Sequence, residues 1–354
     1  MTARLSQLLH DEATHLVPPV PDTAAVLAEG HRLRRRQRVT AGLAAAGVAA
    51  LVAATVGVVV VAGDGGSRAV DPATTDDHAA WAVGSDVHVD GHTAQVPDTV
   101  HSLHYTAAGV LVRSNPHDGA SDGSGPESLT LVRWDGSTVD LGTVPEGVGP
   151  ATDPDEDVYA LAEPAGDGFV AVVRDVETGD VARKVPLPDL PPSYWEVPPL
   201  GLDGDTLYVG YRNQTVALDI ATGEGGPVDG LGGGMPAVAG GHTVARQGGE
   251  DAVLDVVSGK TLLTLAGGAW PVLSPDGSLL LLGDQVLDVS TGATTTLPST
   301  GSDWGWTSGG DLFAVAGDRV TTCDATTAEC TDDALTPPLP RDAFPRLGGR
   351  TYES

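Results

Sequence analysis

The sequence predicts an all-β fold: a β-propeller, with seven blades favoured over six or eight, preceded by one transmembrane helix and a short helical cytoplasmic segment. Three observations lead there. A unit of strand, Asp and Gly-containing turn recurs every 33 to 45 residues. Glycine (47) and proline (26) stand between short runs of Val, Leu, Ala and Thr, which is typical of a turn-rich all-β protein. A long uncharged run lies near the N-terminus.

Residues 1–38 are expected to form the cytoplasmic helical segment. Residues 2–14 read as a short amphipathic helix with Leu5, Leu8 and Leu9 on one side, and a proline-rich break follows it. Thirty-eight residues are too few to build an independent core. The segment is therefore either a tail next to the anchor or a docking peptide for a cytoplasmic partner.

Residues 39–62 contain no charged side chain and, as a helix, would span about 36 Å, enough to cross a bilayer. Arginines precede this run, at Arg32, Arg34, Arg35, Arg36 and Arg38. The linker at 63–79 is acidic instead. This asymmetry predicts a single-pass cell-membrane protein with its N-terminus in the cytoplasm and its C-terminal domain outside. A cleaved signal peptide is the alternative, but the apolar run exceeds the usual 7–15 residues.

The propeller is predicted over residues 80–350 from an internal repeat. The clearest copies begin at Asp175, Asp219, Asp255 and Asp288, each followed four residues later by Gly; a degenerate copy begins at Asp324, and looser ones are Asp135-Gly136 and Asp90-Gly91. Each interval divides into four short strands, the pattern of a propeller blade. The Asp is expected to cap its own turn and the Gly to adopt positive φ, so both are structural.

The two ends of the repeat region predict how the ring closes. The first unit supplies only three strands, whereas the tail 344–349 resembles the inner strands of other units, such as 270–273. The tail is therefore expected to complete the first blade and leave no open edge, which gives seven blades.

Charge excludes one class of partner for the large domain. Residues 63–354 carry thirteen Lys/Arg against forty-four Asp/Glu, in a chain with a net charge of −29. Such a surface repels phosphate backbones, so nucleic-acid binding is not expected. Cations, basic peptides and neutral ligands remain as partners, and the charge also serves solubility.

Cys323 and Cys330, the only cysteines, flank a hairpin of the last blade. Outside the cytoplasm they are expected to form a structural disulfide rather than a redox or metal-binding pair.

Other candidate chemistry is weak. Five histidines fall within one stretch of thirty residues: His88, His92, His101, His104 and His117. We expect them to be exposed histidines on strands rather than the ligands of a metal site. The acidic run 153–157 invites calcium but lacks the spacing of a dedicated loop. No phosphate-binding loop or His-Glu-x-x-His helix is present, and no catalytic residue, metal or cofactor is expected.

Two resemblances add to this. The domain resembles WD-repeat and TolB-like propellers through turns such as Ser274-Pro-Asp-Gly277, although the WD signature is absent apart from Trp134-Asp135. Residues 2–62 resemble the N-termini of actinobacterial membrane proteins encoded beside extracytoplasmic-function sigma factors, some of which are anti-sigma regulators. The zinc-binding His/Cys signature of the best-known anti-sigma proteins is missing, since no cysteine precedes Cys323.

The leading expectation is a membrane-anchored, extracytoplasmic, non-catalytic binding or scaffold module that holds a protein or small ligand on the propeller rim. The first alternative is a transmembrane regulator whose residues 1–38 bind a cytoplasmic sigma factor. The second is a propeller enzyme, which would need acidic or His side chains converging at the central channel.

Overall fold

The computed structural model describes residues 77–117, 125–189, 197–232, 234, 237–247, 250–265, 270–340 and 343–350. The predicted cytoplasmic segment and transmembrane helix lie outside these residues, as does most of the linker. In the ranges described, no helix has the length and hydrophobicity needed to cross a bilayer.

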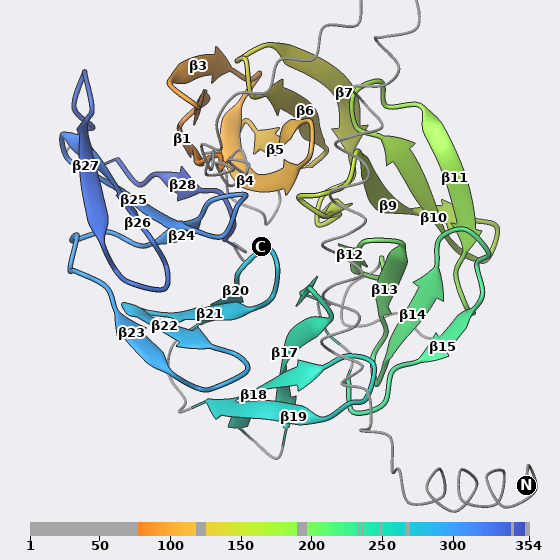
Figure 1. The fold of residues 1–354 in the computed structure, drawn as a ribbon. Coiled ribbons are helices and arrows are strands. Elements are labelled where there is room, and N and C mark those ends of the chain that lie inside the picture. The colour runs from red at the N-terminus through yellow and green to blue at the C-terminus, as the bar shows by residue number, and fades with distance from the viewer. Residues whose placement is uncertain are drawn as a thin grey trace, which may run out of the picture. The chain divides into compact units, whose positions relative to one another are not determined.

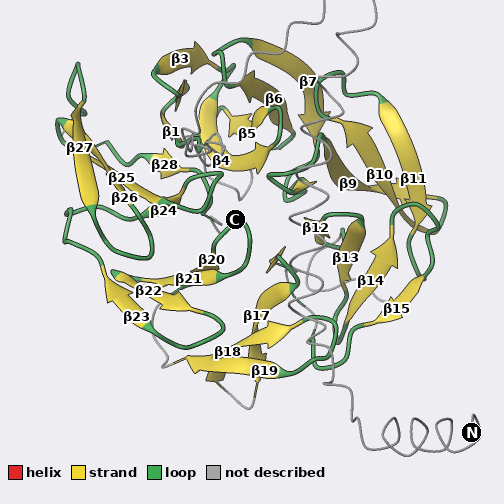
Figure 2. Ribbon diagram, in the orientation of Figure 1, coloured by secondary structure: helices red, strands yellow, loops and turns green. Residues whose placement is uncertain are grey.

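All regular secondary structure in the described ranges is β-strand, and it forms seven antiparallel sheets of four strands, the blades of a propeller (Figures 1 and 2). The prediction of seven blades is confirmed. From the innermost strand outward, the blades are: blade 1, β28 (Arg346–Leu347), β1 (Ala80–Val83), β2 (Asp86–Val89), β3 (His92–Gln95); blade 2, β4 (Thr99–Thr106), β5 (Gly109–Asn115), β6 (Glu127–Arg133), β7 (Thr138–Val144); blade 3, β8 (Ala151–Thr152), β9 (Val158–Ala165), β10 (Gly168–Asp175), β11 (Val181–Pro186); blade 4, β12 (Leu200–Asp203), β13 (Thr206–Gly210), β14 (Thr215–Asp219), β15 (Gly225–Pro227); blade 5, β16 (Val238–Ala239), β17 (His242–Gln247), β18 (Glu250–Asp255), β19 (Thr261–Leu265); blade 6, β20 (Pro271–Leu273), β21 (Leu279–Leu282), β22 (Gln285–Asp288), β23 (Thr294–Thr296); blade 7, β24 (Gly305–Trp306), β25 (Leu312–Ala316), β26 (Arg319–Cys323), β27 (Cys330–Ala334).

Blade 1 is assembled from both ends of the repeat region, as the sequence predicts. The C-terminal β28 pairs with β1, placing Leu347 opposite Trp81. The Gly348 N–H donates to the Ala80 carbonyl at 2.7 Å, and a side chain at this glycine would collide with the Tyr105 hydroxyl. The close approach of backbone to Tyr105 therefore requires glycine at 348.

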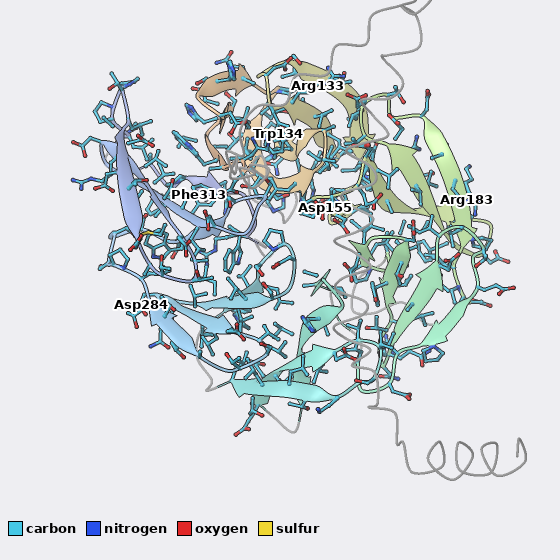
Figure 3. All side chains as sticks on the ribbon, in the orientation of Figure 1. Arg133, Trp134, Asp155, Arg183, Asp284 and Phe313 are labelled. Carbon is cyan, nitrogen blue, oxygen red and sulfur yellow. A yellow bond between two sulfur atoms is a disulfide. The ribbon has the colours of Figure 1, made fainter. Side chains whose placement is uncertain are left out.

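The hydrophobic core is divided into seven clusters, and each cluster fills one interface between neighbouring blades. This follows from strand geometry, because alternate side chains point to opposite faces of a blade and each face meets a different neighbour. At the closing interface, Phe313 of blade 7, which is labelled in Figure 3, packs with Trp81 and Leu347 of blade 1. Closing the ring thus buries apolar surface as well as pairing backbone.

The ring has two distinct faces, which we name for what lies on them. The hairpin face carries the turn between the first and second strands of a blade and the turn between its third and fourth strands. These two turns contact each other; in blade 4, the Ile220 N–H donates to the Asp205 carbonyl at 2.9 Å. The loop face carries the loops that lead into each innermost strand and the remaining turn of each blade.

The repeated Asp caps its turn on the hairpin face, as predicted. In blade 6, the Asp288 carboxylate accepts hydrogen bonds from the Thr291 N–H at 2.7 Å and from the Ser290 hydroxyl at 2.7 Å. Bonds from these groups lower the pKa of Asp288 despite some opposing burial. Gly292 follows with φ of 71°, whereas the degenerate repeat of blade 7 places Ala328 at φ of 55°. These aspartates have a structural role.

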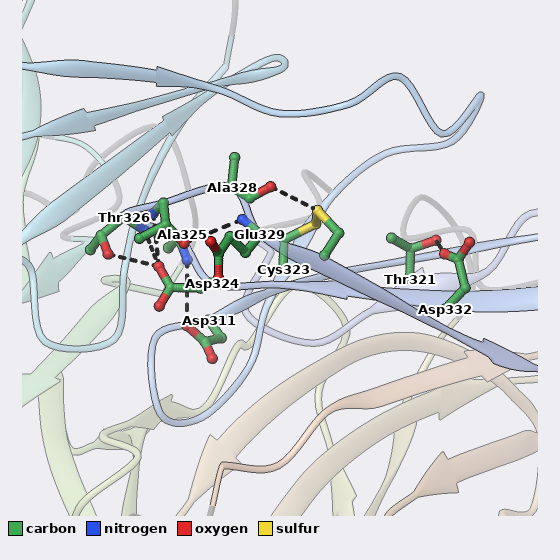
Figure 4. Close-up of a disulfide and its surroundings, with 11 residues drawn as sticks. Asp311, Thr321, Cys323, Asp324, Ala325, Thr326, Ala328, Glu329 and Asp332 are labelled. Carbon is green, nitrogen blue, oxygen red and sulfur yellow. Dashed lines mark hydrogen bonds between the residues drawn. A yellow bond between two sulfur atoms is a disulfide. The ribbon is translucent and has the colours of Figure 1, made fainter.

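The predicted disulfide is confirmed: Cys323 and Cys330 stand directly opposite each other on β26 and β27, with Cα atoms 4.1 Å apart (Figure 4). Cys323 is buried and Cys330 is exposed. The bond therefore fastens the outermost strand of blade 7 to the interior of the blade.

Candidate binding site at the central channel

The innermost strands surround a cavity of about 220 Å³ on the axis of the propeller. Most of its wall is apolar, with Leu103, Leu202 and Val272 among the contributing side chains. The acidic, basic and histidine residues among the described lining are His104 of blade 2, Asp153 of blade 3, Asp203 of blade 4 and Arg350. Acidic and histidine side chains thus do reach the channel, so the bonds that each makes determine its chemistry.

Asp153 begins the acidic run that invites calcium in the sequence, but its carboxylate binds backbone. One oxygen accepts from the Gly204 N–H of the next blade at 2.7 Å, and the other accepts from the Asp155 N–H at 2.9 Å. Burial raises the pKa of Asp153 to about 6, and repulsion from Asp203 and Asp155 adds to the rise, against those two hydrogen bonds. In the described ranges, no three His, Cys, Asp or Glu side chains are grouped to hold a metal ion.

Asp203 repeats this arrangement one blade further on. Its two carboxylate oxygens accept from the Gly240 N–H at 3.1 Å and the Gly241 N–H at 2.8 Å, both in the first hairpin of blade 5. Asp77, directly before blade 1, likewise accepts from the Gly309 N–H of blade 7 at 2.9 Å. We call Asp77, Asp153 and Asp203 the inter-blade carboxylates, because each binds the backbone of a neighbouring blade on the hairpin face.

His104 lies on the channel side of blade 2, where its Nε2 is 2.9 Å from the Ser102 hydroxyl. Burial and, to a smaller extent, the positive charge of Arg113 together lower the pKa of His104 to about 3. The imidazole is therefore neutral at physiological pH.

A buried polar cluster stands behind His104, and sequence reasoning missed it. The Glu127 carboxylate forms an ion pair with Arg113, accepts from the Asn115 amide at 3.2 Å, and lies 3.0 Å from His101 Nδ1. Burial alone would raise the pKa of Glu127, but the bond from His101 and the Arg113 charge hold it below its usual value. The side chains of His101 and Glu127 are 2% and 0% exposed.

The expectation of exposed strand histidines is wrong for His101 and His104. His101 is buried against Glu127, where β4 has a register shift between Val100 and Ser102, and His104 is partly buried at the channel. His92 and His117 are exposed, as expected. His88 is half-buried, stacked on Trp81 with ring centroids 3.7 Å apart. Burial lowers its pKa, against the opposing charge of Asp86.

The inter-blade carboxylates carried a weak signal in the sequence that was not used. Asp153 and Asp203 both directly follow or end an innermost strand, so they occupy matching places in the repeat. Glu127 carried none, since nothing local distinguishes it from other charged residues at the start of a strand. The arginines predicted to set topology, 32 through 38, lie outside the described ranges.

Comparison with known proteins gives structural likeness only. No family model matches the chain, and no curated protein matches it. Among solved structures, a putative 6-phosphogluconolactonase from Bacteroides fragilis has 16% identity and a TM-score of 0.44, covering 78% of this chain and 99% of that one. The Kuenenia stuttgartiensis hydrazine synthase has 15% identity and a TM-score of 0.40, with 64% and 76% covered. The dihydro-heme d1 dehydrogenase NirN has 12% identity and a TM-score of 0.40, with 75% and 74% covered. None of these likenesses assigns a function to this chain.

Proposed function

We propose that this chain is a membrane-anchored binding module whose propeller lies outside the cytoplasm and holds a partner without performing chemistry. The proposal depends on the hydrogen bonds that the acidic and histidine side chains of the channel make. Asp153 and Asp203 use both carboxylate oxygens to bind neighbouring backbone, and His104 is neutral and bonded to Ser102. Groups committed in this way hold a scaffold in shape, which favours binding over acid–base chemistry.

Two further features support the proposed location. The Cys323–Cys330 disulfide fits an oxidising compartment. The arginine cluster before the uncharged run at 39–62, with an acidic domain after it, fits an N-terminus in the cytoplasm.

Location is tested with an epitope tag after Ser354. On intact spheroplasts the tag should bind antibody, and the protein should sediment with membranes. Replacing the five arginines from Arg32 to Arg38 with glutamine should reduce the tagged fraction that is accessible from outside, because the positive charge sets orientation. A tag that becomes accessible only after lysis would place the domain in the cytoplasm and refute the proposed location.

Partners are tested by crosslinked pull-down from native membranes, comparing the full chain with a variant lacking residues 2–30. That deletion leaves the arginines and the apolar run intact. Envelope proteins recovered equally with both chains would support a binding module that acts through its propeller. A sigma factor recovered only with the full chain would instead assign residues 1–38 a regulatory role and make the propeller a sensor.

A further inference from the structure

The last three residues before blade 1 bind the hairpin face of the ring. We call residues 77–79 the strap. The Asp77 carboxylate accepts from the Gly309 N–H of blade 7 at 2.9 Å, and a Cβ at Gly309 would lie 2.6 Å from the same oxygen. The His78 N–H donates to the Ser308 hydroxyl at 3.0 Å, and the His78 carbonyl accepts from the Ser308 N–H at 2.9 Å. The first turn of blade 7 therefore holds the strap through three hydrogen bonds.

The His78 side chain extends this docking to blades 1 and 2. Its Nδ1 lies 2.5 Å from a carboxylate oxygen of Asp90, in the turn between β2 and β3. Its ring stacks on Trp134 of blade 2, with centroids 4.1 Å apart, and the Trp134 Nε1–H donates to the Ala107 carbonyl at 3.2 Å. A contact between imidazole and carboxylate is stronger when the imidazole is protonated, so acid favours this part of the docking.

A contact between two carboxyl groups also depends on a proton. Asp77 and Asp311 of blade 7 face each other within hydrogen-bonding reach, and two carboxyl groups form such a bond only when one is protonated. Burial raises the pKa of Asp311, and the charges of Asp77 and Asp324 add to the rise, against a bond from the Ala325 N–H. A group whose pKa is raised by docking favours the docked state in acid, and that contribution is lost as the pH rises through the raised value. Both proton-dependent contacts therefore have the same sign.

The strap can leave the ring without opening it. It belongs to no strand, since β1 begins at Ala80, and the pairs of β1 with β2 and β28 involve none of its residues. Asp153 and Asp203, in contrast, follow or end innermost strands, so their bonds to the next blade cannot break without disturbing a blade. Docked and detached straps are thus two states of an otherwise unchanged propeller.

We propose that the strap is a pH-sensitive device, which docks on the turns of blades 7, 1 and 2 in acid and detaches as the pH rises. Detachment follows from loss of the Asp77–Asp311 and His78–Asp90 contacts. It lengthens the free chain that leads into blade 1. This inference goes beyond the proposed binding function and does not depend on which partner the propeller holds.

The test measures hydrogen–deuterium exchange of the Ser308 and Gly309 amides in the full chain in detergent micelles, by mass spectrometry with fragmentation that resolves single residues. The strap is the acceptor for both amides, so their protection reports its docking. Exchange times at pH 5 and pH 8 are scaled to the intrinsic exchange rate at each pH. Protection should be about 10- to 100-fold greater at pH 5, the factor for one hydrogen bond to a charged group. Amides of β25, which pair with β26, are the internal reference for overall unfolding.

Conservative variants separate the two contacts. In Asp311→Asn the side-chain amide donates to Asp77 at every pH, so protection at pH 8 should rise. In Asp90→Asn the imidazole loses its charged partner, so protection at pH 5 should fall, and asparagine tolerates the φ of 45° at this position. The double variant should be equally protected at both pH values. Asp318→Asn is the matched control, because Asp318 is an exposed carboxylate of blade 7 in the turn between β25 and β26 on the loop face, and it should behave as the wild type.

Three outcomes would overturn the proposal. Equal protection of the wild type at pH 5 and pH 8 would show that the strap stays docked whatever its protonation. A pH dependence that persists in the double variant would assign it to other groups. Exchange of both amides at the intrinsic rate at either pH would show that the strap does not dock in solution. If any of these occurs while pull-downs still recover envelope proteins, the binding function stands and only the role of the strap is wrong.

Discussion

Ring closure by β28 can be tested at Leu347, which is 1% exposed and packs with Trp81, Phe313 and Val315 at the interface of blades 7 and 1. Leu347→Ala removes three carbon atoms, worth about 2.4 kcal/mol at roughly 0.8 kcal/mol for each buried methylene. The cavity left behind raises the expected loss to about 3 to 4 kcal/mol. Phe344→Ala, three residues earlier and 88% exposed, should alter the free energy of unfolding by less than about 0.5 kcal/mol.

The assay is urea denaturation of the full chain in detergent, followed by tryptophan fluorescence and by circular dichroism of the strands. The free energy of unfolding comes from the midpoint and slope of each curve. A Leu347→Ala protein within about 0.5 kcal/mol of the wild type would refute the argument. It would mean that the C-terminal strand does not hold the ring closed in solution.

Three further changes are expected to have measurable effects on stability. Replacing Cys323 and Cys330 with serine should lower the free energy of unfolding by up to about 2.4 kcal/mol, because the disulfide closes a loop whose ends are 7 residues apart and so restricts the unfolded chain. An equal urea midpoint for oxidised and reduced protein would contradict this. Glu127→Gln leaves the buried charge of Arg113 without its ionic partner and should lower the free energy of unfolding by about 3 kcal/mol at pH 7. Because the folded pKa of Glu127 is lowered, wild-type stability falls as the carboxyl protonates in acid, so the gap between the two proteins should narrow there; a constant gap would argue against the ion pair. Burial raises the pKa of Asp153 from 3.8 to about 6, so the folded state binds the proton more tightly than the unfolded state. The free energy of unfolding of the wild type should therefore fall by up to about 3 kcal/mol as the pH rises from about 4 to above 6. Asp153→Asn should lack that loss, and a pH profile identical to the wild type would refute the assignment.

Local sequence was sufficient to predict the blades, because the residues that form each hairpin turn lie within a few positions of one another. The unit around Asp288 shows this, because its capping carboxylate, the positive-φ Gly292 and the two flanking strands all lie within about fifteen positions. The role of the tail followed from the same pattern, since Phe344 to Gly349 resembles an inner strand.

Contacts between residues far apart in the sequence could not be predicted from local patterns. His101 and Glu127 are 26 residues apart, and their pairing accompanies a register shift in β4 that no local signal announces. The acidic run starting at Asp153 suggested a cation because like charges in sequence imply a shared ligand. The Asp153 carboxylate instead accepts a hydrogen bond from the backbone N–H of Gly204, 51 residues later. The two residues are close only because they belong to adjacent blades of the folded ring.

The inter-blade carboxylates also bear on how such a ring can change over time. Asp77, Asp153 and Asp203 each recognise main-chain amides, which every residue except proline possesses. The amides of neighbouring blades that they bind nevertheless all belong to glycines: Gly204, Gly240 and Gly241 have positive φ, and a Cβ at Gly309 would lie 2.6 Å from the Asp77 carboxylate. Each carboxylate and the glycine turn that it binds are therefore expected to change together rather than independently.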